Sequence, residues 1–377
     1  MLRATRRGLL VGASIGFLAL AGGMLPMTAS SDADAQELEE VRFGLGPYFE
    51  YQPWAIAKDL GLDKEMGFDF VLETVNKVSH AVAGLQTGQY HATFSCQTCT
   101  IPFYENVPTL RNWMVTNQFK GFAIIGRRGQ TPTYAELAPE LGHDKAKEEV
   151  LLSMKGKSFA IVKVNHGPMV DSALQQVGLT LDDVEVLNFP DHPTAGFAFE
   201  SGEGDFYTGA LPQQIRLLTV GDEYVNVGGH EILGPAGLWY STMLSDQTWL
   251  EEDEERALKL LAIWYRTMRY ARERFDYAVE IWTQSLNERM GSDTFTADQT
   301  RVAIEEFEFF PLMEEAAEGV FNPDSDLSWR NSVAHYLPNI ENLPADFDAD
   351  DYEVHSKYYD ALRANEELVA WINAPLK

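Results

Sequence analysis

The segment Val41–Gly61 carries the clearest pattern of apolar and polar positions in the chain. Apolar residues alternate with polar or small ones from Val41 to Leu45, which predicts a short strand. Pro53 suits the first turn of a helix, where a missing N–H costs nothing. Apolar side chains then recur at helical spacing until Gly61, which ends the predicted helix. The segment therefore predicts a strand, a loop and a helix.

The loop between this strand and this helix is rich in aromatic residues. In an open α/β sheet, a loop at the carboxyl end of a strand lies in the crevice where ligands bind. The side chains that we expect to reach a ligand there are Tyr48, Phe49, Glu50, Tyr51 and Trp54. Aromatic rings suit a flat ligand or alkyl groups, and Glu50 suits an amino group, a ring N–H or a cation. The alternative is that the rings cap the core and Glu50 is solvated.

Similar units follow along the chain. The pattern predicts strands at 66–74, 91–95, 112–116 and 121–126, a helix at 79–85 and a helix opening at 96–99. Such alternation implies a mainly parallel sheet. Residues 127–157 lack a strong period, and we place the crossover to a second lobe there.

A second set of units follows the crossover. We expect a strand at 158–164, a turn at 165–168, a helix at 169–177, a strand at 184–188 and a helix that ends at 201. A strand at 237–244 returns to the first lobe, and the chain is helical from 248 onward, with an acidic, solvated loop at 346–353. The predicted lobes are 36–127 with 236–377, and 128–235.

Two segments, 85–94 and 199–208, resemble each other. In each, a predicted helix ends at a glycine and a short strand leaves at once. Two lobes built on one plan would produce this similarity. The helix–glycine–strand order is also common in α/β proteins, so chance is the alternative.

Composition narrows the function. The 377 residues suffice for two lobes, and 45% hydrophobic and 12% aromatic residues are typical of a packed globular protein. The 57 acidic residues outnumber 29 basic ones and give a net charge of −28. This charge disfavours nucleic acids and anionic membrane surfaces as partners.

Residues 1–35 are typical of an export signal. Arg6 and Arg7 stand before an apolar run from Gly8 to Met27, in the manner of a twin-arginine signal. The small residues that end at Ala35 suit cleavage, so we expect a periplasmic mature chain from 36 onward. The alternative is an uncleaved membrane anchor, because the run is just long enough to span a bilayer.

The order of several segments resembles periplasmic solute-binding proteins of the nitrate/sulfonate/taurine type, which are related to pyrimidine-precursor binders. The segments are LQTGQYHATFS, MKGKSFAIVKVNHGPMVDSALQQVGL, LDDVEVLNF and ESGEGDFYTGALP, within a similarity that covers most of 41–245. The resemblance implies the type II periplasmic-binding-protein fold, with two α/β lobes and a hinge. It also implies a small-molecule ligand clamped between the lobes and delivered to an ABC permease and its ATPase.

Four turns at strand ends should then face one cleft: Tyr48–Trp54, Ser95–Thr98, Asn165–Gly167 and Asp191–Thr194. Helix N-termini at the second and third turns favour an anionic or polar acceptor group, although ordinary helix capping is the alternative. Beyond the first loop, the candidate ligand contacts are Ser95, Cys96, Gln97, Asn165, His166, Asp191, Asp205 and Tyr207, whereas Trp239 is more typical of a core position.

The ligand class follows from charge. None of the four turns contains Arg or Lys. We therefore favour an amino-bearing, heteroaromatic or zwitterionic organic ligand, with a sulfonate or carboxylate held by backbone N–H groups as the alternative.

Cys96 and Cys99 form a CxxC pair. In an oxidising periplasm we rank structural thiols or a local disulfide first, ligand lining second, and redox or metal chemistry last. Zinc would need four ligands, and the spacing of nearby histidines is poor, so we expect no metal.

Two other function classes make different demands on the sequence. An enzyme like the related pyrimidine synthase would need a lysine for pyridoxal phosphate and a histidine. A surface interaction protein would need no cleft. We expect neither, and predict a cofactor-free monomeric binding protein without catalytic activity.

Overall fold

The chain is described by a computed structural model that covers residues 38–376, apart from 98, 220, 293, 340–342 and 344–346. The predicted export signal at 1–35 lies outside the described residues. Among the helices that are described, none combines the length and the apolar character needed to cross a bilayer.

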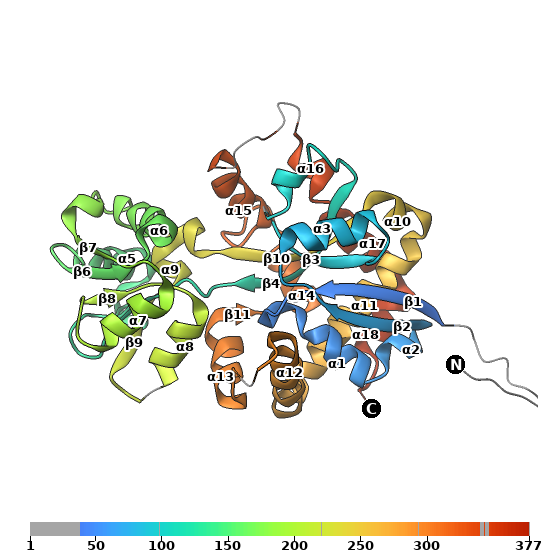
Figure 1. Ribbon diagram of the computed structural model, residues 1–377, viewed down its shortest axis with the longest axis horizontal. Helices are drawn as coiled ribbons and strands as arrows, with labels where there is room; N and C mark the ends of the chain where they lie inside the picture. The colour runs from blue at the N-terminus through green and yellow to red at the C-terminus, as the bar shows by residue number, and fades with distance from the viewer. Residues whose placement is uncertain are drawn as a thin grey trace, which may run out of the picture. The chain divides into compact units, whose positions relative to one another are not determined.

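The first lobe is built on a six-stranded sheet with the order β11-β4-β10-β3-β1-β2 (Figure 1). Its strands are β1 (Glu39–Leu45), β2 (Phe68–Thr74), β3 (Ala92–Cys96), β4 (Leu110–Phe119), β10 (Trp239–Asp246) and β11 (Glu308–Phe309). Strand β1 pairs in parallel with β2 and β3, as expected. However, β10 is antiparallel to β3 and β4, and β11 is antiparallel to β4. The sheet is therefore mixed and not mainly parallel, because β10 returns from the second lobe in the opposite direction.

The second lobe has a five-stranded sheet with the order β7-β6-β8-β5-β9. Its strands are β5 (Ile124–Arg127), β6 (Ser158–Ile161), β7 (Glu185–Asn188), β8 (Phe206–Tyr207) and β9 (Tyr224–Gly228). Strand β5 was predicted in the first lobe, but it pairs antiparallel with β8 and β9. The chain thus changes sheet at 120–123, and it returns between 229 and 238.

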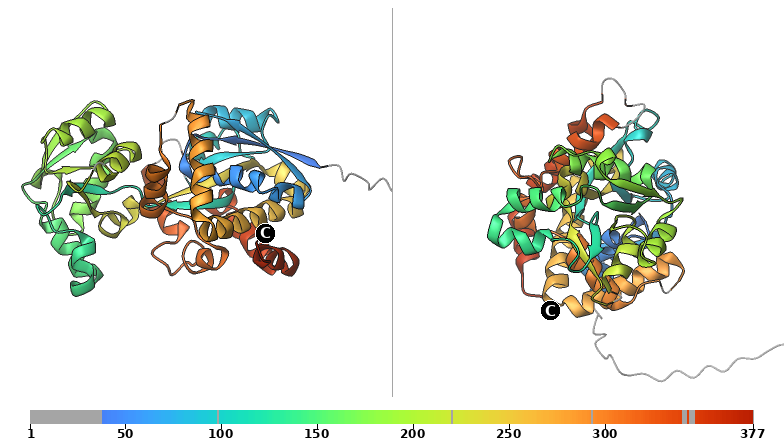
Figure 2. Two further views of the ribbon diagram at one scale, coloured as in Figure 1. Left: turned by 90° about the horizontal axis from the view of Figure 1, so that it is seen from below. Right: turned by 90° about the vertical axis from the view of Figure 1, so that its left-hand side faces the viewer.

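Helices surround both sheets. Those of the first lobe are α1 (Pro53–Asp59), α2 (Leu62–Glu65), α3 (Val78–Gln86), α10 (Gln247–Glu252), α11 (Glu254–Glu273), α12 (Phe275–Met290), α13 (Ala297–Val302), α14 (Met313–Glu318), α15 (Trp329–Tyr336), α16 (Ala349–Tyr352), α17 (His355–Ala364) and α18 (Glu366–Asn373). Those of the second lobe are α4 (Tyr134–Leu141), α5 (His143–Leu152), α6 (Lys163–Gln175), α7 (His192–Glu200), α8 (Leu211–Thr219) and α9 (His230–Leu233). Figure 2 shows the C-terminal helices, coloured orange to red, gathered on the first lobe.

The core of the first lobe centres on Trp54, whose helical spacing in the sequence predicted a buried face. Its ring stacks on Phe43 with centroids 4.6 Å apart and lies 5.2 Å from the ring of Trp264 on α11. Helix α11 presents Leu260, Leu261 and Trp264 to this core, as its apolar stripe indicates. The long C-terminal helices therefore complete the core of the first lobe.

The similarity between 85–94 and 199–208 is structural. Helix α3 is followed by Gly88 at φ 71° and then by β3, while α7 is followed by Gly202 at φ 100° and then by β8. Both glycines adopt a left-handed conformation that side chains disfavour, so each glycine ends its helix and turns the chain into a strand.

Three local predictions need correction. Helix α6 begins at Lys163, because the Lys163 N–H donates to Asn188 Oδ1 at 2.9 Å directly after β6. Residues 165–168 therefore lie within α6 and not in a turn before it. No α-helix opens at Cys96, since a disulfide joins Cys96 to Cys99 and only a short 3₁₀ helix, Ile101–Phe103, follows. Glu353, predicted as solvated, is 2% exposed.

Candidate functional site

A cavity of about 450 Å³ lies where the loop after β1 meets the start of α8 and the two crossovers. Its lining joins apolar and aromatic side chains of both lobes to two carboxyl groups: Pro47, Tyr48, Phe49, Glu50, Phe119, Phe122, Ala210, Leu211, Pro212, Trp239, Leu286, Met290, Phe295 and Glu308. We call it the first cavity. Its volume suits a small organic molecule.

The two carboxyl groups come from distant segments. Glu50 lies in the 3₁₀ helix Phe49–Tyr51 and accepts a hydrogen bond from Ser241 Oγ at 3.0 Å. Glu308 is the first residue of β11, is 6% exposed, and accepts a hydrogen bond from Asn117 Nδ2 through Oε2. The pairing of β11 with the edge of β4 thus brings Glu308 into the lining of the same cavity as the loop.

Burial makes both carboxyl groups hard to ionise. It raises the pKa of Glu50 to about 7, against the opposing effect of the hydrogen bond from Ser241. Burial, together with repulsion from Glu50, raises the pKa of Glu308 well above its usual range. Among the described residues that line this cavity, none is Lys, Arg or His. The pair therefore retains a proton near neutral pH.

Aromatic rings form much of the remaining wall. Tyr48 is 44% exposed, and Phe49 packs edge-on against Phe295 with centroids 4.9 Å apart. The rings of Phe122 and Trp239, one from each crossover, lie edge to face at 6.5 Å. Such rings can stack on a flat ligand or surround a cationic group.

A second cavity, of about 690 Å³, shares Phe122 and Trp239 with the first. Its other walls are one face of α6, the end of α15 and the crossover residue Ala236: Asn165, His166, Pro168, Met169, Asp171, Ser172, Gln175, His335 and Tyr336 complete the lining. The two rings therefore stand between two chambers.

His166 is the buried polar residue of this second cavity. It is 7% exposed, and its Nε2 has no hydrogen-bond partner among the described residues. Burial, followed by the proximity of His192, lowers the pKa of His166 to about 4, so its imidazole is neutral at physiological pH. Asn165 Nδ2 lies 3.2 Å from His192 Nε2. No cluster of three metal-ligating side chains occurs in the part of the chain described here.

The loop after β1 divides between cavity and core. Tyr48, Phe49 and Glu50 line the first cavity. Tyr51 is 1% exposed and donates from its hydroxyl to the carbonyl of Ser95, and Trp54 is fully buried in the core. The first three residues thus form part of the cavity wall, while the last two hold the loop in place.

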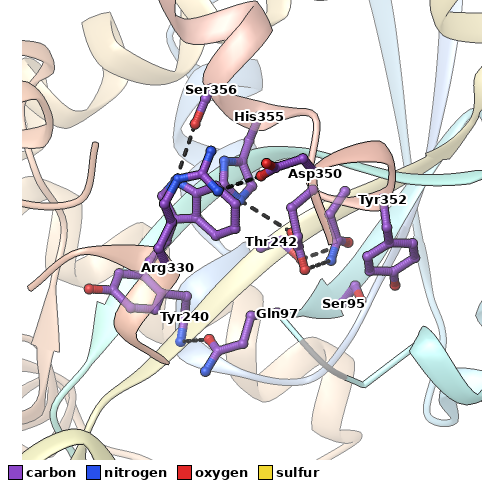
Figure 3. A network of polar contacts seen from close by, with 12 residues as sticks. Ser95, Gln97, Tyr240, Thr242, Arg330, Asp350, Tyr352, His355 and Ser356 are labelled. Carbon is purple, nitrogen blue, oxygen red and sulfur yellow. Dashed lines mark hydrogen bonds and ion pairs between the residues drawn. The ribbon is translucent and has the colours of Figure 1, made fainter. Parts of the chain in front are cut away.

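The residues at the end of β3 are covered by the C-terminal segment (Figure 3). Gln97 accepts from the Tyr240 N–H and donates to Ser332 Oγ of α15 at 2.6 Å. Ser95 Oγ lies 2.9 Å from Thr100 Oγ1, and Cys96 is held in its disulfide. The structure does not bring Ser95, Cys96 or Gln97 to either cavity.

Three candidates in the second lobe serve its own structure. Asp191 caps α7 by accepting from the Thr194 N–H at 2.8 Å, as the capping alternative stated. Asp205 accepts from both the N–H and the hydroxyl of Ser158 at 2.8 Å. Tyr207 is fully buried and stacks on Phe199 at 5.9 Å. None of the three lines either cavity.

Sequence reasoning missed several lining residues. Glu308 lies between Phe307 and Phe309 in a segment that was predicted to be helical, and a single carboxylate among aromatic residues was the available signal. Trp239 was weighed as a core residue, and Phe122 was not singled out. Nothing local marks the crossovers as walls of a cavity.

Comparison with known proteins shows which solved structures have a similar fold. No family model and no curated protein matches the sequence. The periplasmic aliphatic sulphonate binding protein SsuA from Escherichia coli matches with a TM-score of 0.55 and 14% identity, over 84% of this chain and 92% of that chain. The chain has the fold of the periplasmic binding proteins. The fold class predicted from the sequence is therefore confirmed.

Two further solved structures agree. The ligand-binding component of an ABC-type import system from Staphylococcus aureus matches with a TM-score of 0.54 and 12% identity, over 85% of this chain and 98% of that chain. The periplasmic nitrate-binding protein NrtA from Synechocystis PCC 6803 matches with a TM-score of 0.51 and 12% identity, over 90% of this chain and 92% of that chain. At such low identity the likeness concerns the fold alone.

Proposed function

We propose that this chain is the exported solute-binding component of an ABC importer, and that it holds a small amino-bearing organic ligand in the first cavity. The observation that carries the proposal is the pairing of Glu50 with Glu308 inside an aromatic cavity between two lobes. The three solved structures of similar fold described above are binding proteins of periplasmic or ABC-type import systems, which supports the general role.

The lining favours the ligand class. A carboxyl group accepts hydrogen bonds from an amino group or a ring N–H, and aromatic rings stack on a flat heterocycle. A sulfonate would meet two acidic groups and no basic side chain among the described lining residues, which disfavours it in this cavity. The second candidate function is an anion binder that uses the second cavity, where the neutral His166 and Asn165 offer N–H donors near the start of α6.

The remaining parts of the proposal concern location and partners. We propose that the export signal is cleaved near Ala35, and that the mature chain is a periplasmic monomer that delivers its ligand to a permease and its ATPase. Hinge motion of the two crossovers would open and close the cavity. Cell fractionation with N-terminal sequencing tests the location, and light scattering tests the monomer.

A thermal-shift measurement tests the ligand class. Purified mature chain is heated with amino-pyrimidines, betaines, aromatic carboxylates and alkanesulfonates in turn. We expect an amino-bearing compound to raise the melting temperature, because it binds only the folded chain. Glu50→Gln should reduce the shift, while Glu306→Gln, an exposed glutamate near Glu308 in sequence, should not. A shift caused by sulfonates alone would favour the anion binder, and chemical turnover of any compound would favour an enzyme.

A further inference from the structure

Glu50 and Glu308 line the same cavity, and the charge of Glu50 contributes to the raised pKa of Glu308. Both line the first cavity, and each has one hydrogen-bond donor from a side chain, Ser241 for Glu50 and Asn117 for Glu308. Oε1 of Glu308 has no hydrogen-bond partner among the described residues, although the residue is 6% exposed. This oxygen keeps some solvent accessibility, so it is free to accept a hydrogen bond from a ligand in the first cavity.

The charged groups on neighbouring elements are engaged elsewhere. Lys120 lies with Nζ 4.7 Å from the ring centroid of Phe309, and its attraction is to Glu231 in the second lobe. Arg272 of α11 pairs with Glu315 at 2.5 Å. Arg289 of α12 donates to Gln52 Oε1 at 2.9 Å. Across the described residues, no ion pair reaches either carboxyl group.

The other titratable groups that face the pair are phenols. Repulsion by Glu50 adds to burial in raising the pKa of both Tyr48 and Tyr51. These phenols therefore stay neutral and supply no positive charge. Within the first cavity, the two carboxyl groups have each other, neutral donors and aromatic rings around them, while Glu308 also borders a neighbouring pocket whose lining includes Arg272 and Glu305.

We propose that the first cavity takes a singly charged organic cation, such as an alkylammonium or quaternary ammonium group, and that its entry displaces a proton from the Glu50–Glu308 pair. This inference rests on the proposed function and narrows its ligand class. The cation would take the place between the carboxyl groups, and the proton would leave to solvent. The only bond that breaks is the carboxyl O–H bond, whose electron pair stays on the carboxylate while water takes the proton.

The apolar walls are suited to such a guest. A quaternary ammonium group carries its charge on an apolar surface and is attracted to aromatic faces, which Phe49, Phe122 and Trp239 supply. A metal ion would instead need more oxygen ligands than the two carboxyl groups give.

The direction of the pH effect follows. Below about pH 6 both carboxyl groups are protonated and the cation must compete with a proton. The pKa of Glu50 is about 7. As pH rises through this value, a growing fraction of Glu50 is already ionised, so cation binding displaces fewer protons on average. Affinity for a cation should therefore rise with pH, by up to about tenfold per unit, and then level off.

The experiment compares three probes of similar size by isothermal titration on the mature chain. Choline is the cation, 3,3-dimethylbutan-1-ol is its uncharged isostere, and butane-1-sulfonate is the anion. Titrations at about pH 6 and about pH 8, each in two buffers with different ionisation enthalpies, measure affinity and proton release. Glu50→Gln tests the ionising member of the pair, and Glu306→Gln is the exposed control.

We expect choline to bind at least about tenfold more tightly than its isostere at the higher pH, and to release up to about one proton near pH 6. Glu50→Gln, which removes the group that ionises near pH 7, should remove most of this preference and of the proton release while still unfolding in a single cooperative transition. Equal binding of choline and the isostere, or binding without proton release, would overturn the inference but leave the binding function intact. If butane-1-sulfonate is the only probe that binds, the proposal of a cationic ligand is overturned and the anion-binding function is favoured. If none of these probes and none of the compounds in the thermal-shift panel binds, both proposals fail.

Discussion

The rings of Phe122 and Trp239 lie edge to face, with centroids 6.5 Å apart, and both line both cavities. Each ring sits on a different crossover between the two sheets. Trp239 is also held from the other side by Tyr336 of α15, whose ring lies 5.1 Å away and whose hydroxyl donates to Ala236 O at 2.9 Å. Residues of the two crossovers are therefore also walls of both cavities.

Trp239→Ala should join the two chambers. We expect the ligand found in the thermal-shift measurement to bind about tenfold more weakly, because a wall that buries its apolar surface is lost, while bulkier relatives gain affinity. Isothermal titration measures both effects. Trp249→Ala is the control, because Trp249 packs on Arg256 and lines neither cavity. Unchanged affinity and an unchanged range of ligands in Trp239→Ala would contradict the separating role.

The raised pKa of Glu50 predicts a pH-dependent stability. The folded chain holds a proton at Glu50 up to about pH 7, whereas the unfolded chain releases it near its ordinary value of 4.5. The resulting stabilisation is present below that ordinary value and is lost as pH rises through about 7. Glu50→Gln removes this loss, so the variant should gain stability relative to the wild type between about pH 5 and about pH 8.

Urea unfolding at both pH values measures the difference in free energy. Glu306→Gln, which replaces an exposed glutamate, should change little between the two conditions. A Glu50→Gln variant whose stability relative to the wild type stays constant across this range would show that Glu50 ionises normally in the folded chain.

The buried pair Glu353 and His355 predicts the opposite pH effect. Their Oε2 and Nε2 atoms lie 3.2 Å apart, the His355 ring packs against Trp329 of α15, and Asn112 Nδ2 donates to the other Glu353 oxygen at 3.1 Å. Burial, then the charge of Arg330, lowers the pKa of His355 to about 3. Since the unfolded histidine protonates below its ordinary value of 6.5, stability from this residue is present above that value and lost toward about 3.

We therefore expect His355→Gln to flatten the loss of stability on acidification, and the exposed His80→Gln to leave it unchanged. Glu353→Ala should cost about 3 kcal/mol at neutral pH, because it empties a buried site and leaves Asn112 without its acceptor, while Glu353→Gln should cost less. Denaturant titrations across the acid range check all four variants. Parallel curves for His355→Gln and the wild type would contradict the assignment.

Local pattern predicted much of the fold. The strands β1, β2, β3, β6 and β7 and the helices α1, α3 and α7 lie close to where alternation, proline and glycine placed them. Residues 165–168 were misassigned, because Gly167 and Pro168 are typical of a turn, whereas a hydrogen bond from Lys163 to Asn188 starts α6 earlier. The prediction of a solvated acidic loop was wrong at Glu353, which is buried, because a run of charged residues in the sequence does not show which of them later helices cover.

The candidate site divides in the same way. Tyr48, Phe49 and Glu50 were found because a loop at the end of a strand faces a cleft in this kind of fold. Ser95, Cys96 and Gln97 follow the same rule, yet α15 and α16 cover them, and these helices come more than two hundred residues later in the chain. A cover formed by helices so far along the chain cannot be recognised from the sequence around β3.

The sequence by itself determined the periodic elements, the glycine stops, the acidic surface and the aromatic loop, since each depends on neighbouring residues along the chain. Only the tertiary structure decided that Glu308 and Glu50 line one cavity, that Phe122 meets Trp239 and that the end of β3 is covered. The physical reason is that these contacts join segments far apart in the chain, and their energies depend on burial that no local pattern encodes.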